Sequence, residues 1–224
     1  MTGMILKFKP VSQRYYFFLM QPEHREILSE WSRSFLNSPW KDCFCALKGA
    51  DMNLTELLLT RRSVRQYADE PVPEETLRKV LTAGLLAPTS RNLKPCRFTV
   101  VRNKSTLEAL SHAKAAGGAF LKDAGAAVVV SADAELADTW IEDCSIALTC
   151  MHLAAAEAGV GSCWIQIHLR RDREGGEAEE NVRRILGLED RFRTVGILSL
   201  GMPAASPEPH TIEEADFGQV RFLD

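Results

Sequence analysis

The sequence predicts a protein of the α+β class, and three observations support this. Several segments repeat apolar residues at helical spacing, and four short apolar runs bounded by turn residues have the pattern of strands. One long segment, 138–158, is apolar around nearly its whole circumference, as expected for a helix buried on several sides. With 46% hydrophobic and 25% charged residues, the 224-residue chain has the composition of a globular protein with a buried core.

The beginning of the chain differs from the rest. Residues 1–51 show no clean hydrophobic period, whereas Asn53-Leu54-Thr55-Glu56 has the pattern of a helix start with a capping box. We therefore expect 1–51 to be an N-terminal extension of uncertain structure and 52–224 to form the domain. Because Met52 directly precedes the helix start, we also expect the functional chain to begin near it. The intact mass of the protein from its native host tests this expectation.

The remaining elements follow from local patterns. Pro73 with Glu74 and Glu75 predicts a helix start, and Pro88 ends that helix. A polar loop at 89–95 separates it from the next element. We then expect a strand at 98–101, helices at 104–113 and 119–123, a buried strand at 126–131, the long helix at 138–158, a strand at 162–167, a helix at 177–186 capped by Gly187, a strand at 194–200, and a short run at 219–222 able to add a strand elsewhere.

Charge and composition exclude several classes of protein. A net charge of −3 and a pI near 6.0 argue against binding nucleic acid or an anionic membrane through bulk charge. No apolar run approaches the ~20 residues that span a bilayer. Tyr15 to Met20 is too short for the apolar region of a secretory signal and lacks a small-residue cleavage site, so we expect none. Six cysteines in this length indicate a reduced, cytoplasmic setting rather than a disulfide framework. Cys43 and Cys45 have no second pair at zinc-ligand spacing, so we expect no metal site.

The segment 61–65, Arg-Arg-Ser-Val-Arg, is the first candidate site. If the helix that starts at Leu54 continues through it, Arg61 and Arg65 lie one turn apart on the same face and Arg62 points away. Two guanidinium groups and the Ser63 hydroxyl then converge, as a doubly charged phosphate requires. The alternative is a basic helix end exposed to solvent.

Four motifs occur in register between residues 52 and 203. They are RRSVR at 61–65, PTSRNLKPCRF at 88–98, AAAEAGVGSCWIQ at 154–166 and GILSLGMP at 196–203. Together they resemble the nitroreductase family of FMN-dependent oxidoreductases. The resemblance implies a central, mostly antiparallel sheet flanked by helices and an intertwined homodimer. It also implies that FMN lies at the subunit interface and that a C-terminal segment reaches onto the partner.

The resemblance assigns roles to individual positions. Helix 138–158 becomes the dimer-interface helix. The predicted FMN contacts are Arg61, Ser63 and Arg65, in the cluster with Arg62, for the phosphate and ribityl chain; Pro88, Thr89, Ser90, Asn92 and Lys94 for the isoalloxazine ring, from the other subunit; and Ile165 and Gln166, whose backbone lies near the reactive edge of the flavin.

Two departures from the family pattern stand out. Lys94-Pro95-Cys96 replaces the usual Gln-Pro-Trp, so a large packing group is missing behind the loop, and Lys94 either places a cation near the ring or faces solvent. The usual basic phosphate contact after Pro203 is also absent. Its possible replacements are His210, Arg221, or Arg170 with Arg171.

The expected activity is hydride transfer from NADH or NADPH through FMN to an electron-poor small-molecule acceptor of the nitroaromatic or quinone type. The mechanism is ping-pong, with the flavin N5 and no protein nucleophile carrying the chemistry. One alternative is a flavin store or sensor without turnover. Another is a reductive dehalogenase or flavin-degrading enzyme on the same scaffold.

Overall fold

The computed structural model describes residues 53–205 and 207–223, so the predicted extension at 1–51 and the predicted start at Met52 lie outside the described residues. Along the chain the elements are helices α4 (Leu54–Thr60) and α5 (Glu74–Leu85), the 3₁₀ turn η2 (Ser90–Asn92), β1 (Cys96–Val101), α6 (Lys104–Ser111), η3 (Ala119–Asp123), β2 (Ala126–Asp133), α7 (Trp140–Glu157), β3 (Gly161–Gln166), α8 (Ala178–Leu186), β4 (Phe192–Gly201), η4 (Ile212–Glu214) and η5 (Phe217–Gln219).

The four strands form one sheet in the order β1-β2-β4-β3, and every neighbouring pair is antiparallel. β2 and β4 are central, and their residues are almost entirely buried because helices cover both faces. β3 is an edge strand. The predicted antiparallel sheet flanked by helices is confirmed.

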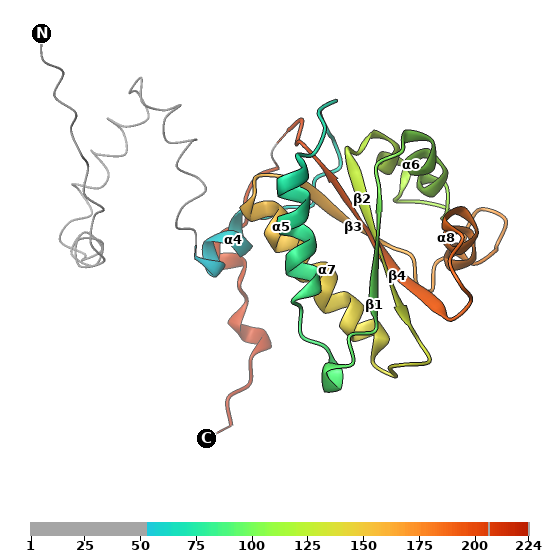
Figure 1. Cartoon of the computed structure of the whole chain (residues 1–224). Helices are drawn as coiled ribbons and strands as arrows, with labels where there is room; N and C mark the ends of the chain where they lie inside the picture. The colour runs from blue at the N-terminus through green and yellow to red at the C-terminus, as the bar shows by residue number, and fades with distance from the viewer. Residues whose placement is uncertain (1–52, 206, 224) are drawn as a thin grey trace, which may run out of the picture. The chain divides into compact units, whose positions relative to one another are not determined.

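Helices α5 and α7 cover one face of the sheet, and α6 and α8 cover the other (Figure 1). Period-2 alternation along β2 divides its side chains between the two cores, with Val128 and Val130 facing α7 and Val129 facing α6 and α8. Helices α5 and α7 approach each other closely at Gly84 of α5, where an added Cβ would lie 2.9 Å from Met151 of α7. This packing fixes α7 against the sheet.

The predicted helices and the four strands 98–101, 126–131, 162–167 and 194–200 are confirmed, with ends that differ by a few residues. Asn53 and Glu56 form the predicted capping box of α4, and Gly187 ends α8 with a left-handed φ of 64°. Within this chain the segment 219–222 is not a strand: the described C-terminal segment consists of 3₁₀ turns and irregular chain. No helix in the described residues is long and apolar enough to cross a membrane.

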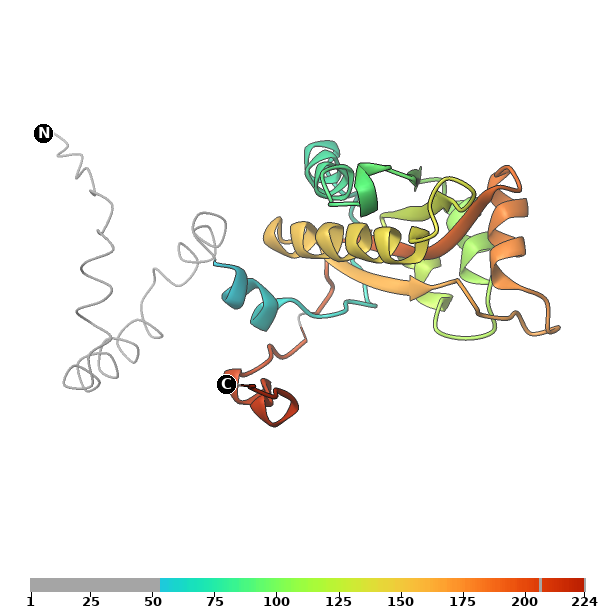
Figure 2. The same ribbon diagram turned by 90° about the horizontal axis from the view of Figure 1, so that it is seen from below.

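Helix α4 and the segment 207–223 lie together beyond one end of the sheet (Figure 2). The His210 amide donates to the Leu59 carbonyl at 2.8 Å, which joins the two pieces. Both expose large apolar side chains: Leu54 is 62% exposed, Phe217 72% and Phe222 77%.

Candidate functional site

The basic segment Arg61–Arg65 is extended, not helical. α4 ends at Thr60, whose hydroxyl donates to the Glu56 carbonyl at 2.8 Å, and Arg61 already has extended backbone angles. The prediction that Arg61 and Arg65 share a helix face was therefore wrong. In an extended chain, side chains alternate between two sides. This alternation groups Arg61, Ser63 and Arg65 on one side of the segment and puts Arg62 on the opposite side.

This segment lies against the free edge of β3. Ser63 forms a parallel bridge with Ser162, and the Val64 amide donates to the Ser162 carbonyl at 2.9 Å. At the far end of the strand, the Lys114 ammonium donates to the Gln166 carbonyl at 3.2 Å. Alternate backbone groups of a strand face the same way, so Gln166 presents its backbone at this edge. The Ile165 side chain is buried in the α6–α8 core.

His152 on α7 contacts the Arg61 guanidinium. The Arg61 Nη1 lies 3.0 Å from His152 Nε2, and His152 Nδ1 contacts the Ser162 hydroxyl. A guanidinium can only donate, so Nε2 accepts and Nδ1 carries the proton. Burial, and then the nearby Arg61 charge, lower the pKa of His152 to about 4, which keeps the imidazole neutral at physiological pH.

Three cations from two segments, Arg61 and Arg65 of the basic segment and Lys114 of the loop after α6, lie along β3 near Cys163. Burial raises the pKa of the Cys163 thiol, while Arg65, Lys114 and Arg61 lie close enough to lower it. Within residues 53–205 and 207–223, none of these three cations forms an ion pair with a carboxylate. Burial and then Arg170 lower the pKa of Lys114. The cluster therefore carries positive charge that no described acid compensates.

The second group of predicted residues lies on the loop before β1. Arg91, Asn92 and Lys94 all have φ between 51° and 55°, a conformation that residues other than glycine seldom adopt. The loop is held by the Lys94 amide, which donates to Thr89 Oγ1 at 3.1 Å, and by the Ser90 amide, which donates to Asp143 Oδ1 at 2.8 Å. Backbone strain of this kind gathers at functional sites. Pro88, Asn92 and Lys94 are exposed.

Within one chain the two groups lie at different positions along α7. The loop contacts Asp143, and the basic segment contacts His152, nine residues further on. At 1.5 Å per residue this separates the two anchor points by about 13 Å along the helix. The two groups of predicted residues are thus separate within one chain.

The other predicted basic residues have different partners. Arg62 donates to the Glu208 carbonyl of the C-terminal segment, and His210 contacts Glu214 at 2.7 Å. Arg171 donates to the Gly175 carbonyl at 3.2 Å. Arg170 is the predicted replacement that lies near the cluster, because its charge lowers the pKa of Lys114.

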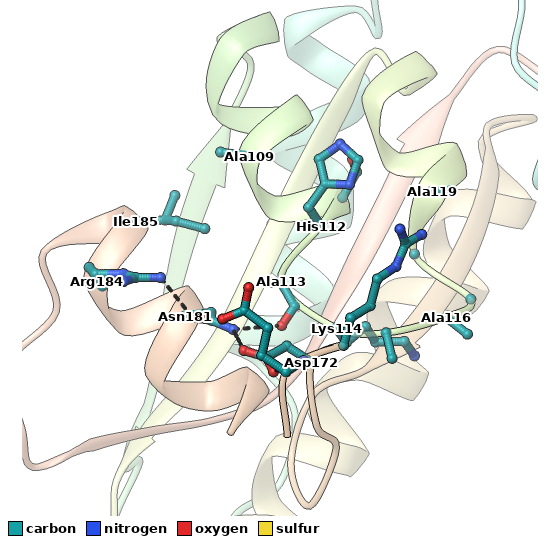
Figure 3. A pocket seen from close by; sticks show the side chains of 16 residues that line it. Ala109, His112, Ala113, Lys114, Ala116, Ala119, Asp172, Asn181, Arg184 and Ile185 are labelled. Carbon is teal, nitrogen blue, oxygen red and sulfur yellow. Dashed lines mark hydrogen bonds between the residues drawn. The ribbon is translucent and has the colours of Figure 1, made fainter. Parts of the chain in front are cut away.

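A pocket of about 400 Å³ lies between α8 and the loop that follows α6 (Figure 3). Asn181 donates to Asp172 Oδ2 at 2.8 Å and to the Ala113 carbonyl at 3.2 Å, and Arg184 donates to the Asn181 amide oxygen. Lys114 lines this pocket, but none of the predicted FMN contacts does. The candidate site is therefore the free edge of β3, with Lys114 between it and the pocket.

A model of the nitroreductase family matches residues 58–133 and 108–202, which together span both groups of candidate residues. The chain belongs to the nitroreductase family. A relative from Methanothermobacter thermautotrophicus, provisionally named an NADH dehydrogenase/NAD(P)H nitroreductase, is 34% identical over 172 residues, covering 75% of this chain and 87% of the relative.

Solved structures place this nitroreductase-family chain in the same fold. An FMN-dependent nitroreductase from Clostridium difficile superposes with a TM-score of 0.75 at 38% identity, covering 76% of this chain and 99% of the other. A protein from Desulfovibrio desulfuricans, provisionally named a nitroreductase and solved in complex with FMN, has a TM-score of 0.61 at 26% identity, covering 78% and 100%. The predicted nitroreductase-like fold is confirmed.

Proposed function

We propose that this protein is an FMN-dependent oxidoreductase that takes hydride from NADH or NADPH and reduces an electron-poor organic acceptor, a nitroaromatic or a quinone, by ping-pong turnover. Membership of the nitroreductase family supports the reaction class. The FMN complex of the Desulfovibrio relative and the NAD(P)H in the name of the Methanothermobacter relative support the cofactor and the hydride donor.

The observation that carries the proposal is the uncompensated cationic row on the β3 edge. Arg61 and Arg65 flank Ser63, which bridges to Ser162 of β3, and Lys114 stands at the other end of the strand. A phosphate monoester carries up to two negative charges, which two guanidinium groups match in charge and in hydrogen-bond geometry. The charge of the cluster thus fits the FMN phosphate.

Within this arrangement each residue has a distinct task. Arg61 and Arg65 hold the phosphate, and Ser63 donates a hydroxyl hydrogen to the phosphate or the ribityl chain. His152 keeps Arg61 in place through its neutral Nε2. Gln166 offers backbone groups at the free edge of the strand, and Lys114 orients its carbonyl. When bound, FMN supplies the hydride-accepting centre, and the protein supplies binding and electrostatics.

We further propose that the site is completed in a homodimer. The loop of Pro88 to Lys94 is anchored about 13 Å along α7 from the phosphate residues, so the same loop of a second subunit would cover the ring. The exposed apolar side chains of α4 and of the C-terminal segment, including Phe217 and Phe222, support an exchange of these segments between subunits.

Anaerobic titration of the purified full-length protein with NADH and NADPH tests the function. We expect a yellow protein with flavin absorbance that bleaches on reduction and recovers when a quinone or nitroaromatic is added. Absorbance that does not bleach would indicate a flavin store or sensor instead. A colourless, monomeric protein that does not take up added FMN would overturn the proposal.

A further inference from the structure

Cys96 and Cys144 form a thiol pair beside the candidate flavin loop. Their sulfur atoms lie 3.8 Å apart, in the geometry of a weak S–H···S contact. Cys96 is the first residue of β1 and is partly exposed, whereas Cys144 lies on α7 and is fully buried. These two residues are 48 positions apart, and the fold alone brings them together.

We propose that Cys96 and Cys144 are a peroxide-sensitive thiol pair that closes to an intramolecular disulfide. A disulfide requires sulfur atoms about 2.05 Å apart, so the observed sulfurs must approach by a little under ~2 Å. The approach is short because each thiol already faces the other. Cys96 is the first residue of β1 and directly follows the loop of residues 89–95.

The surroundings assign a different role to each sulfur. Cys96 is the more acidic thiol, because the hydrogen bond with Cys144 lowers the pKa of Cys96 against its partial burial. The same contact, and then burial, raise the pKa of Cys144. A thiolate is the nucleophile toward peroxides, so Cys96, which is also the less buried of the two, reacts first.

The oxidant is a hydroperoxide. The Cys96 thiolate attacks one peroxide oxygen, the O–O bond breaks, and the departing oxygen takes a proton to leave as water or an alcohol. Cys96 is then a sulfenic acid. The Cys144 sulfur attacks the Cys96 sulfur, the S–O bond breaks, and the hydroxyl leaves as water with the Cys144 proton. Two thiols are oxidised, and one peroxide is reduced.

The disulfide would connect the end of the loop at 89–95 to α7, next to the hydrogen bond that already joins this loop to Asp143. Asp143, adjacent to Cys144, accepts a hydrogen bond from the Ser90 amide at 2.8 Å. Cross-linking Cys96 to the neighbouring position therefore changes the attachment of a loop that already has three strained residues, Arg91, Asn92 and Lys94. An effect on FMN affinity rests on the proposed function, whereas disulfide formation does not.

Peroxide titration followed by alkylation and peptide mass mapping tests the pair in the full-length protein, both without FMN and after incubation with it. We expect loss of both free thiols, a linked Cys96–Cys144 peptide pair that dithiothreitol separates, and no link to Cys150. Cys144→Ser should leave a sulfenic acid at Cys96 that dimedone traps. Cys150→Ser, a matched change on the same helix, should leave the disulfide intact.

Three results would overturn the proposal: both thiols stay alkylatable at peroxide concentrations that oxidise Cys150, Cys96 links to another cysteine, or Cys144→Ser gives no dimedone adduct. Cys96→Ser provides a second variant, because it must abolish the link without changing the circular dichroism spectrum. The peptide mapping needs no flavin signal. A failure to form the disulfide can therefore be distinguished from a failure to bind FMN.

Discussion

Arg61 and His152 are in direct contact, with 3.0 Å between Nη1 and Nε2, although 91 positions separate them in the chain. His152 in turn contacts the hydroxyl of Ser162, the residue whose carbonyl holds Val64. α7, the edge strand β3 and the basic segment are thus joined by one polar chain. A change at His152 should therefore act on the proposed phosphate-binding residues through Arg61.

The depressed pKa of His152 predicts a pH dependence of stability. The imidazole has a pKa near 6.5 when unfolded and about 4 in the fold, so the unfolded chain binds more protons between these values. The neutral His152 therefore contributes fully to the free energy of unfolding above pH ~6.5. This contribution is lost as the pH falls toward 4, and the loss is on the order of 3 kcal/mol at most. Urea unfolding of the wild type and His152→Gln from pH 7.5 to 4.5 measures it. Identical slopes for both proteins would contradict the assignment.

Arg65 should affect FMN binding far more than folding. Its side chain is exposed, and its described contacts are a 3.5 Å approach to the Ser63 carbonyl and a position 5.9 Å from the Phe120 ring. Arg65→Ala should remove a charge-assisted contact worth about 1.5–3 kcal/mol and weaken FMN binding roughly ten- to a hundredfold. Fluorescence titration with FMN measures this. Arg78→Ala, which breaks a surface ion pair on α5, is the control, and equal affinities for both variants would count against the site.

The basic segment packs closely against β3 at Gly161. An added Cβ would lie 2.8 Å from Val64 Cγ1 and 3.0 Å from Val64 Cβ. Gly161→Ala should displace Val64 and destabilise the protein by about 1–3 kcal/mol, as overpacking does.

The double variant Val64→Ala/Gly161→Ala checks the cause of this effect. Removing the Val64 methyl groups relieves part of the clash. The stability losses of the two single variants should therefore add up to more than the loss in the double variant. Thermal or urea unfolding of the four proteins gives the coupling energy. Strict additivity would show that Gly161 acts in another way.

Local patterns were sufficient to predict the elements of the fold. The Asn53–Glu56 capping box, the left-handed Gly187 and the uninterrupted apolar run of β2 depend on neighbouring residues, which the sequence displays directly. The helical reading of 61–65 failed because a strand contact decided its conformation. The Val64 amide pairs with Ser162, about a hundred positions away, and no local signal shows such a partner.

The candidate site was predicted from residue types, but its supporting residues were not. His152, Lys114 and Asp143 act through contacts with Arg61, Gln166 and Ser90, each far away in the chain. The Ser90 amide donates to Asp143, which is 53 positions away, and the sequence shows no sign of this partner. A buried acid near the start of an apolar helix was the one visible signal, because such a group needs a donor.

The link between Asp143 and Ser90 yields the last prediction. Asp143 is 2% exposed and accepts from the Ser90 amide at 2.8 Å and from the Thr139 hydroxyl at 3.4 Å. Asp143→Ala leaves the Ser90 amide without this acceptor, so it should cost about 1–3 kcal/mol and release the strained loop. Asp138→Ala removes a surface ion pair with Arg91 on the same loop and should cost under ~1 kcal/mol. Urea unfolding with proteolysis of the loop distinguishes the two. If both variants lose the same stability and resist proteolysis equally, the loop is held by other contacts and not by the buried carboxylate.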